Sequence, residues 1–406
     1  MVNREFLVST IVVRRFSVLG STHLMFRHLP ILQRSWKAPR WLAGLGCVLL
    51  FFGGTTVHPT TAVEFRSALP GYHYRFPQDH GTHNDFQTEW WYYTGHLRTD
   101  DGKTFGYQLT FFRRAVTREA AVRNPSRWAL RHLYFAHFAV TDEEGRRFHF
   151  AEKISRAGIR KAGADAGRLA VWIDDWRAEE KGSAHELHAR ADGIALHLNL
   201  TPAKPLVIHG ADGISRKGES PSESSHYYSF SRMRTEGTLA VGEKSFPVTG
   251  QSWMDHEFGS NQLGEAQIGW DWFSLQLSDA AELMVYRIRR QDGSVEPASG
   301  GTWIGPDGAA LSLSRDDIAI EVLDHWQSPQ SGGRYPARWR LRVPSVHLSV
   351  EIIPTVPHQE LITRRSTHVT YWEGSVTIKG ERENRPISGL GYAELTGYAT
   401  PLQRRL

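Results

Sequence analysis

The segment Trp90–Leu97 (WWYYTGHL) has a counterpart later in the chain, Trp270–Leu277 (WDWFSLQL). When the two segments are aligned on their last residues, both carry an aromatic side chain at the first, third and fourth positions. Short segments rich in aromatic residues are typical of β-strands. The same opening strand is therefore expected twice, which indicates an internal repeat.

The closing segments of the two copies also correspond, and they keep the same order along the chain. The matches are Glu236–Leu239 (EGTL) with Glu373–Val376 (EGSV), and Trp253–Asp255 (WMD) with Tyr392–Glu394 (YAE). We therefore predict a duplicated β-module, with domains over residues 65–258 and 259–400 and residues 259–269 as the linker. Chance similarity among aromatic strands is the alternative explanation.

The rest of the chain after residue 62 has the same character. Alternating segments such as Leu133–Val140 and Ile194–Leu200 are separated by Asp-Gly turn formers, and Gly and Pro interrupt most windows long enough for a helix. The sequence thus predicts an all-β protein of small barrels, whose interior suits a small apolar ligand. The polar stretch Arg216–Ser225 (RKGESPSESS) is expected to be an exposed loop.

Charge and composition narrow the classes of function. The 406 residues are 40% apolar and 11% aromatic, which is enough for a packed core. The net charge is +5, but residues 1–62 hold six Arg and one Lys against one Glu, or +6, and leave −1 for the rest. No nucleic-acid partner is expected, because phosphate binding needs a dense basic face. The single cysteine, Cys47, excludes disulfides within the chain and Cys-rich zinc sites.

Residues 1–62 have the organisation of an export signal. Basic residues precede the apolar run Trp41–Gly54, and small residues follow it up to Ala62. The run is shorter than the roughly 18–20 residues that span a bilayer. We therefore predict cleavage near Ala62 and an exported protein, periplasmic or secreted. An uncleaved leader would tether the protein to a membrane, lipidation at Cys47 is a further alternative, and Met25 is an alternative start.

The stretch Asp79–Asp85 (DHGTHND) leads into the strand that contains Glu89. Asp79, His80 and His83, together with Glu89, offer the carboxylate and imidazole groups that suit zinc. Their spacing is not a strong metal signature, so we favour a loop whose side chains cap and hydrogen-bond one end of a barrel. We expect no metal and no cofactor.

A second group of candidate residues centres on Asp255. Alternation along a strand places Trp253, Asp255 and Glu257 on one face. A carboxylic acid walled by Trp and Tyr loses solvation, so its pKa rises and it can deliver a proton near neutral pH. Aromatic faces can stabilise the carbocation that forms when an alkene is protonated. A buried Asp that only accepts hydrogen bonds is the alternative, and a triad of Ser252, His256 and Asp255 lacks a nucleophile-elbow pattern.

At these motifs the sequence resembles the family of the carotenoid 1,2-hydratase and the AttH-like secreted proteins. The segments that carry the resemblance are 79–97 (DHGTHNDFQTEWWYYTGHL), 226–233 (HYYSFSRM), 250–262 (GQSWMDHEFGSNQ), 268–277 (IGWDWFSLQL) and 391–398 (GYAELTGY). The resemblance covers essentially the whole chain after the leader and implies two lipocalin-like β-barrel domains. It also implies that Asp255 is the proton donor of a hydratase, with His226, Tyr228 and Trp253 around it.

The residues that surround Asp255 in the implied site differ from those expected in the hydratase branch of that family. In that branch Trp is expected at Tyr228, Tyr at Trp253, and an Asn-Trp pair at residues 257–258, where this chain has Glu and Phe. The sequence therefore looks closer to the AttH-like branch, for which the resemblance supplies no substrate.

The leading hypothesis is a cofactor-independent hydratase that binds an apolar small molecule, an isoprenoid or a lipid, and protonates a carbon–carbon double bond with Asp255. In this hypothesis Trp253 and Tyr228 shield the cation, and His226 orients the acid or the water. The predicted ligand-binding residues are Trp91, Tyr93, Trp270 and Trp272. A non-enzymatic lipid or pigment carrier, which needs the aromatic strands but no acid, and a secreted hydrolase are the alternatives.

Overall fold

The computed structural model describes residues 64–116, 130–261 and 264–402, which lie within one compact unit, Thr60–Leu406. The predicted export leader, including Cys47 and Ala62, lies outside the described residues, so its cleavage and the export of the protein stay predictions. Among the residues that are described, no helix has the length and apolar character required to cross a membrane.

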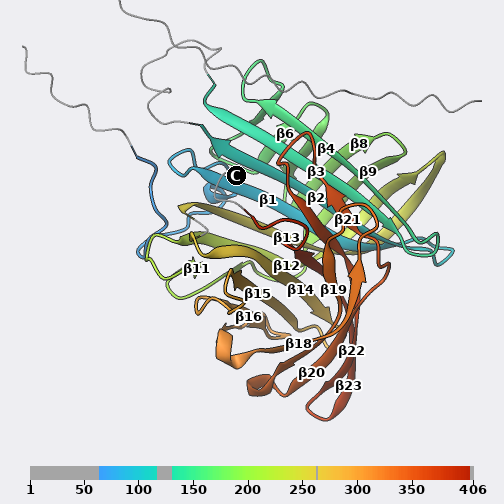
Figure 1. Cartoon of the computed structure of the whole chain (residues 1–406). Coiled ribbons are helices and arrows are strands. Elements are labelled where there is room, and N and C mark those ends of the chain that lie inside the picture. Colours follow the sequence, from blue (N-terminus) through green and yellow to red (C-terminus); the bar gives the residue numbers. More distant parts are fainter. Residues whose placement is uncertain (1–63, 117–129, 262–263, 403–406) are drawn as a thin grey trace, which may run out of the picture. The chain divides into compact units, whose positions relative to one another are not determined.

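The described chain is built from antiparallel strands, which confirms the predicted all-β class. The helical elements within it are three single turns of 3-10 helix, at Gln78–His80 (η1), Arg315–Asp317 (η2) and Pro344–Val346 (η3). The strands form two barrel-like sheets, which we call the first and the second barrel (Figure 1).

The first barrel is a 13-stranded sheet in which the path of paired strands is β4-β3-β2-β1-β13-β12-β9-β8-β7-β6-β5, with β10 and β11 paired to β12. Its strands are β1 (Thr88–Arg98), β2 (Thr104–Ala115), β3 (His132–Asp142), β4 (Arg147–Arg156), β5 (Ala162–Ala164), β6 (Ala170–Ile173), β7 (Trp176–Lys181), β8 (Ala184–Ala191), β9 (Ile194–Pro202), β10 (Val207–Ile208), β11 (Ile214–Arg216), β12 (Ser224–Val241) and β13 (Lys244–Asn261). The predicted strands Leu133–Val140 and Ile194–Leu200 are confirmed as β3 and β9.

The second barrel is a 10-stranded sheet with the path β17-β16-β15-β14-β23-β22-β20-β19-β18, and β21 pairs with β22. Its strands are β14 (Gln267–Leu277), β15 (Glu282–Arg290), β16 (Gly300–Ile304), β17 (Ala310–Ser314), β18 (Ala319–Gln327), β19 (Arg334–Val343), β20 (Leu348–Pro354), β21 (Glu360–Ile362), β22 (Thr370–Arg382) and β23 (Arg385–Leu395). The stretch expected as a linker is partly strand, because β13 continues to Asn261 and β14 begins at Gln267.

The loop expected at Arg216–Ser225 is shorter than predicted. Arg216 ends β11, while Ser224 and Ser225 begin β12 and are fully buried. The burial has a local cause, because the Ser224 hydroxyl donates to the carbonyl oxygen of Ala68 at 2.6 Å. Small hydroxyl side chains are typical of loops, and for this reason the sequence predicted one here. In the structure these hydroxyl groups form their hydrogen bonds inside the fold.

The two barrels repeat one strand arrangement. The opening strand β1 pairs with the closing strand β13 of the first barrel, and the opening strand β14 pairs with the closing strand β23 of the second. In these pairs Tyr92 lies opposite Asp255, and Trp272 lies opposite Glu394. The residues matched between the copies in the sequence therefore occupy matching places in the sheets.

Side chains alternate between the two faces of each strand, so that one set of them points into the interior of each barrel. The first interior is filled by residues such as Trp91, Tyr93 and Met254, and the second by residues such as Phe273 and Ala393. Strands β1, β13, β14 and β23 are unusual because their other face is buried as well. The second face needs a second layer to cover it.

That second layer is the other barrel. A third apolar cluster, which we call the seam, contains residues of both sheets: Tyr92, Val207, Tyr227, Trp253, Trp272, Met284, Ile304 and Tyr392, with Trp90, Trp270 and Tyr286 half-buried against it. The indole of Trp272 packs edge-on against the ring of Tyr92, with 5.2 Å between centroids. Hydrogen bonds reinforce the contact, including one from His96 Nε2 to the carbonyl oxygen of Gly391 (2.8 Å).

We expect the contact between the barrels to depend on Gly106 of β2. A Cβ atom at this position would lie 2.7 Å from both Ser375 Cβ and Tyr392 Oη of the second barrel, closer than packed atoms tolerate. Gly106→Val should therefore lower the free energy of unfolding by about 1–3 kcal/mol. Chemical denaturation followed by tryptophan fluorescence measures this change.

The matched control is Gly167→Ala, because a Cβ atom there meets only Asp165 Oδ1, at an ordinary 3.6 Å. This variant should change the free energy of unfolding by less than about 0.5 kcal/mol. Equal stability of the two variants would show that the barrels do not pack closely at Gly106.

Candidate functional site

The residues predicted to form one site lie on two faces of the sheet. Asp255 and Trp253 point into the seam, where Trp272 also lies and Trp270 packs at the edge. His226 and Tyr228, expected beside Asp255, point to the opposite face of β12. The expectation that they surround Asp255 is therefore wrong, because antiparallel pairing sets Ser229, and not Tyr228, opposite Asp255.

His226 and Tyr228 belong to an aromatic group at one end of the first barrel. The imidazole of His226 lies 4.4 Å from the ring centroid of Tyr72 and 5.1 Å from that of Phe258. The hydroxyl of Tyr228 lies 2.7 Å from His80 Nδ1 and 2.9 Å from His256 Nδ1. Both side chains are packed in an aromatic core, where Tyr228 is hydrogen-bonded and Nδ1 of His226 has no partner among the described residues.

The predicted ligand-binding residues are divided in the same way. Trp91 and Tyr93 lie inside the first barrel, where Trp91 stacks on His256 with 4.9 Å between centroids, and the Tyr93 hydroxyl lies 3.1 Å from His185 Nδ1. Trp270 and Trp272 lie at the seam. Only this second pair shares a face with the predicted acid.

Asp255 is held in the seam by neutral hydrogen-bonding side chains, and the Tyr227 hydroxyl lies near it as well as Trp253 and Ser229. The Trp253 indole donates to Asp255 Oδ1 at 2.6 Å, and the Ser229 hydroxyl donates to the same atom. The side chain is almost fully buried, and no Lys or Arg of the described chain forms an ion pair with it. Burial raises the pKa of Asp255 to about 7, although the hydrogen bonds from Ser229 and Trp253 act to lower it.

A chain of hydrogen bonds joins Asp255 to the second barrel. His209 Nε2 lies 2.7 Å from the Ser229 hydroxyl, and His209 Nδ1 lies 2.9 Å from the Thr302 hydroxyl of β16. Because Ser229 gives its proton to Asp255, His209 must donate from Nε2 and accept at Nδ1. Burial lowers the pKa of His209 to about 3, so the imidazole is neutral and the direction of the chain is fixed.

Two more carboxyl groups face the seam from the second barrel. Glu394 of β23 lies directly opposite Glu373 of β22, and the Trp270 indole donates to Glu394 Oε2 at 3.1 Å. Burial raises the pKa of Glu394 to about 7. Burial, and then the charge of Glu394, raise the pKa of Glu373 well above its ordinary value. Neither carboxyl forms an ion pair within the described residues.

The sequence interpretation missed Ser229, His209, Glu373 and Glu394 as members of this group. A signal for Glu394 was present, because the repeat aligns it with Asp255. The other three carried no signal, since their place depends on strand register and on which outer face of each barrel is covered.

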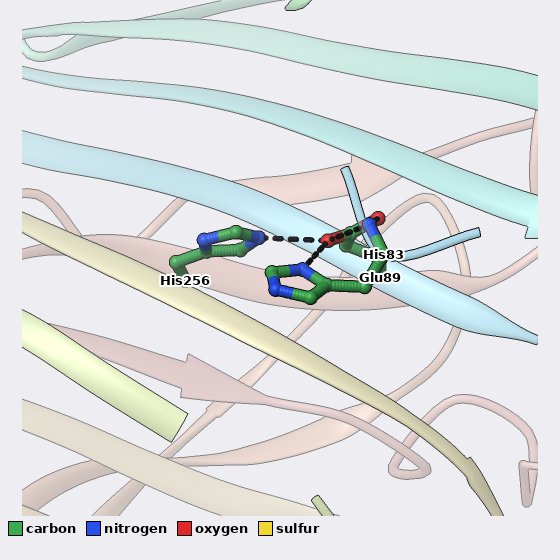
Figure 2. A group of neighbouring side chains, drawn as sticks. All are labelled: His83, Glu89 and His256. Carbon is green, nitrogen blue, oxygen red and sulfur yellow. Dashed lines mark hydrogen bonds and ion pairs between the residues drawn. The ribbon is translucent and has the colours of Figure 1, made fainter. Parts of the chain in front are cut away.

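Two of the four candidate metal ligands, His83 and Glu89, form a separate group with His256 inside the first barrel, and the three side chains place their polar atoms within 4.8 Å of one another. Figure 2 shows both imidazole rings directed at the carboxylate: His83 Nδ1 lies 2.7 Å and His256 Nε2 lies 2.9 Å from Glu89 Oε1. The other oxygen accepts from Arg113 Nε (2.8 Å) and from the Thr82 hydroxyl (2.7 Å).

The donor set around Glu89 fits an ion pair better than a metal. Although burial acts to raise the pKa of Glu89, the charge of Arg113 and the hydrogen bonds of His256 and His83 hold it well below its ordinary value. A guanidinium 2.8 Å from the carboxylate would repel a cation. The geometry favours the predicted role of these side chains as hydrogen-bonded supports of the barrel end.

The triad considered for a hydrolase is not assembled. The hydroxyl of Ser252 lies 2.6 Å from the hydroxyls of Tyr107 and Thr235, while His256 contacts Glu89 and Tyr228. Asp255 lies on the other face of β13 from both Ser252 and His256. Acyl-transfer chemistry by these three residues has no geometric support.

An open cavity of about 470 Å³ lies elsewhere, against β15, β16 and η2 of the second barrel. Its lining includes Arg287, Arg315 and Ile318. The guanidinium of Arg287 already pairs with Asp271 at 2.6 Å. None of the predicted site residues lines this cavity, and we place the candidate site at the uncompensated acids of the seam, because buried carboxyls with shifted pKa values mark functional sites.

The family profile of AttH-like proteins matches residues 67–398, which is most of the chain. The chain belongs to the AttH-like family. This AttH-like protein is similar to the crystal structure of a protein described as an AttH from Nitrosomonas europaea, with 35% identity and a TM-score of 0.75, over 82% of this chain and 99% of the other. The resemblance predicted from the motifs is confirmed.

Two further relatives are informative about this AttH-like protein. Kievitone hydratase from Nectria haematococca shares its fold, with a TM-score of 0.64 at 14% identity over 84% of this chain and 98% of the other. The ceramide-binding protein svf1 of Aspergillus fumigatus is 26% identical over 161 residues, which are 37% of this chain. The match spans only 41% of that relative's length.

We expect Glu89 of this AttH-like protein to be a structural residue. Glu89→Gln leaves the buried guanidinium of Arg113 without its counter-charge, which should lower the free energy of unfolding by about 3–5 kcal/mol. Chemical denaturation measures the loss. Added zinc should leave the melting temperature of the unchanged protein where it is, and a zinc-dependent rise would instead establish His83, Glu89 and His256 as metal ligands.

The raised pKa of Asp255 predicts a pH-dependent stability. A carboxyl whose pKa is raised from 3.8 to about 7 on folding adds stability below pH 3.8 that is lost as the pH rises through 7. Asp255→Asn removes this dependence. The free energy of unfolding of the unchanged protein, relative to the variant, should fall by about 4 kcal/mol between pH 4 and pH 8.

Denaturation of both proteins across this pH range provides the test. Other titrating groups, such as Glu394, contribute equally to the free energy of unfolding of both proteins. Their contributions therefore cancel when the value for the variant is subtracted from that for the unchanged protein. A difference that is constant between pH 4 and pH 8 would mean that Asp255 titrates as an exposed carboxyl does.

Proposed function

We propose that this protein is a cofactor-independent hydratase that adds water across a carbon–carbon double bond of an apolar ligand bound at the seam. The observation that carries the proposal is the Asp255 carboxyl, which is buried among Trp and Tyr side chains, has no counter-charge within the described chain, and has a pKa near 7. Such a group is protonated in part at neutral pH and is poised to act as a general acid.

The hydrogen bonds of Asp255 define which oxygen would deliver the proton. Oδ1 accepts from Trp253 and Ser229, so the acidic proton resides on Oδ2. Transfer of this proton to one alkene carbon forms a C–H bond from the π electrons and leaves a cation on the other carbon. The hydrogen bonds to Oδ1 then stabilise the carboxylate that remains.

The aromatic residues of the seam suit the cation. Tyr92, Trp253 and Trp272 lie within one cluster with Asp255, and the rings of Trp253 and Trp272 are 6.4 Å apart and nearly perpendicular. The faces of such rings attract positive charge. A water molecule that attacks the cation forms the C–O bond from an oxygen lone pair, and the protonated alcohol becomes the alcohol when it gives one proton to a carboxylate or to solvent. The half-buried Trp90 and Trp270 mark the edge at which an apolar ligand would enter.

The relatives support the proposal at the level of the fold. A hydratase is built on the same two-barrel architecture, which makes the chemistry compatible with this scaffold. The substrate is the part of the proposal that rests on chemistry alone: a trisubstituted double bond, as in isoprenoids, gives a tertiary cation, which is the cation that a weak carboxylic acid can best reach.

A carrier for a lipid is the second candidate function, and the ceramide-binding relative favours it. A carrier would use the same apolar seam residues without the proton of Asp255. The two candidates therefore differ in what they require of one carboxyl group.

Asp255→Asn separates the two candidates. The amide keeps the shape of the side chain and removes the acidic proton, so hydration should fall by about 10²–10⁴-fold. The assay offers a panel of acyclic isoprenoids that end in a trisubstituted double bond, in detergent micelles and H₂¹⁸O, and measures ¹⁸O in the alcohol by mass spectrometry. Asp324→Asn, at an exposed position of β18, is the matched control and should keep full activity.

Retained hydration by Asp255→Asn would remove Asp255 from the mechanism. A protein that binds members of the panel but transfers no ¹⁸O to any of them, with equal binding by the Asp255→Asn variant, would support the carrier and overturn the hydratase.

A further inference from the structure

We propose that Glu394 is the general base of the same site, and that it takes the proton from the water that attacks the cation formed by Asp255. This inference rests on the proposed function, and it assigns a second catalytic residue, supplied by the second barrel. It follows from the placement of Glu394 in the repeat, from its partners, and from two polar atoms in the seam that lack a well-formed hydrogen bond.

The internal repeat places Glu394 in the second barrel where Asp255 lies in the first. Asp255 is in the closing strand β13, opposite Tyr92 of the opening strand β1. Glu394 is in the closing strand β23, opposite Trp272 of the opening strand β14. Because Tyr92 and Trp272 contact each other across the seam, both carboxyls flank the same pair of aromatic rings.

The two carboxyls also have matching aromatic donors. The Trp253 indole donates to Asp255 at 2.6 Å, and the Trp270 indole donates to Glu394 at 3.1 Å. Each indole occupies one oxygen of its carboxyl partner, and Asp255 has the Tyr227 hydroxyl as a further neighbour. The seam thus holds two tryptophan-bound carboxyls, one from each barrel.

The neighbours of the two carboxyls differ in a way that separates an acid from a base. Asp255 is held by the neutral donors Ser229 and Trp253, whereas Glu394 lies opposite another carboxyl, Glu373. Two buried carboxyls side by side do not both ionise readily, so the pair retains one proton and offers one carboxylate near neutral pH. That carboxylate can accept a proton from water.

Two polar atoms point to a small polar ligand at this place. The hydroxyl of Tyr92 and Oε1 of Glu373 are buried, and neither completes a well-formed hydrogen bond with a described residue, although the two groups lie close enough for Tyr92 to lower the pKa of Glu373. Tyr92 faces the charges of Glu373, Glu394 and Asp255, which act with burial to raise its pKa well above 10. Buried polar groups are almost always satisfied, often by an ordered water. A water held by Tyr92 and Glu373 would lie beside Glu394.

The complete reaction then balances. Asp255 gives its proton to one alkene carbon, and the π electron pair forms the C–H bond. The oxygen of the water forms the C–O bond with the other carbon, and one water proton passes to the carboxylate of Glu394. Net addition of H₂O gives the alcohol, and the resting state returns when Glu394 releases a proton to solvent and Asp255 takes one up.

Glu394→Gln tests the assignment through the fate of the cation. The experiment uses D₂¹⁸O and the member of the isoprenoid panel that the unchanged protein hydrates fastest. In the variant Asp255 still delivers a deuteron, but without the base the cation returns to alkene more often than it captures water. Hydration should fall by about 10²-fold, and the ratio of deuterated alkene to ¹⁸O-labelled alcohol should rise at least about tenfold relative to the unchanged protein.

The outcomes distinguish this inference from the proposed function. Neither deuterium nor ¹⁸O incorporation by the unchanged protein, with any member of the panel, would overturn both. Hydration by the unchanged protein together with an unchanged ratio in Glu394→Gln would overturn only the role of Glu394. Asp255→Asn should lose both labels, which shows that the exchange in Glu394→Gln depends on the acid.

Folding of the variant is controlled in two ways. The amide oxygen that Glu394→Gln introduces can still accept from Trp270, so the thermal unfolding midpoint should stay close to that of the unchanged protein. Glu394→Asp keeps the carboxylate on a shorter side chain, and it should restore part of the hydration that Glu394→Gln loses. A low but equal activity of both variants would indicate a structural role and overturn the assignment.

Discussion

Burial of a second face on strands β1, β13, β14 and β23 governs the chemistry of this molecule. The outer face of a barrel strand normally meets water and carries polar side chains. Here the outer faces of the two barrels cover each other, so carboxyls such as Asp255, Glu373 and Glu394 are desolvated without a cation beside them. Loss of water makes the neutral acid the favoured form, and this converts an outer surface into a site that can transfer protons.

The sequence predicted the two barrels because their evidence is local. Aromatic alternation, turn formers and a repeated pair of opening and closing segments are visible without knowing any contact, and Asp255 with Trp253 shared a face by parity alone. The neighbours of Asp255 could not be found in this way. In β12, residues 226 and 228 point to one face of the sheet, and residues 227 and 229 point to the other. The register that sets Ser229 opposite Asp255 places residues 227 and 229 on the same face as Asp255. A shift of this register by one residue would have placed residues 226 and 228 on the face of Asp255.

The repeat accounts for the presence of a carboxyl on each side of the seam. An acidic residue in the closing strand of each copy lies on the outer face of its barrel, and the outer faces of the two barrels cover each other at the Tyr92–Trp272 contact. The surroundings of the two carboxyls differ: Asp255 has neutral donors, through Ser229 and the His209–Thr302 chain, and Glu394 has an acidic neighbour in Glu373. The equivalent positions thus share a raised pKa of about 7 but differ in their partners, and in our proposal the partners decide which carboxyl donates a proton and which accepts one.

A comparison of Glu89 with Asp255 explains why we propose the seam, and not the barrel interior, as the reactive part. Both carboxyls are buried, but Glu89 is paired with Arg113 and bonded by two imidazoles and a hydroxyl, so it stays ionised and all its lone pairs are engaged. Such a group stabilises the fold and has no proton to give. Asp255 accepts from the neutral donors Trp253 and Ser229 and has no cation beside it, so burial favours its protonated form. Burial alone therefore does not create an acid; burial without a counter-charge does.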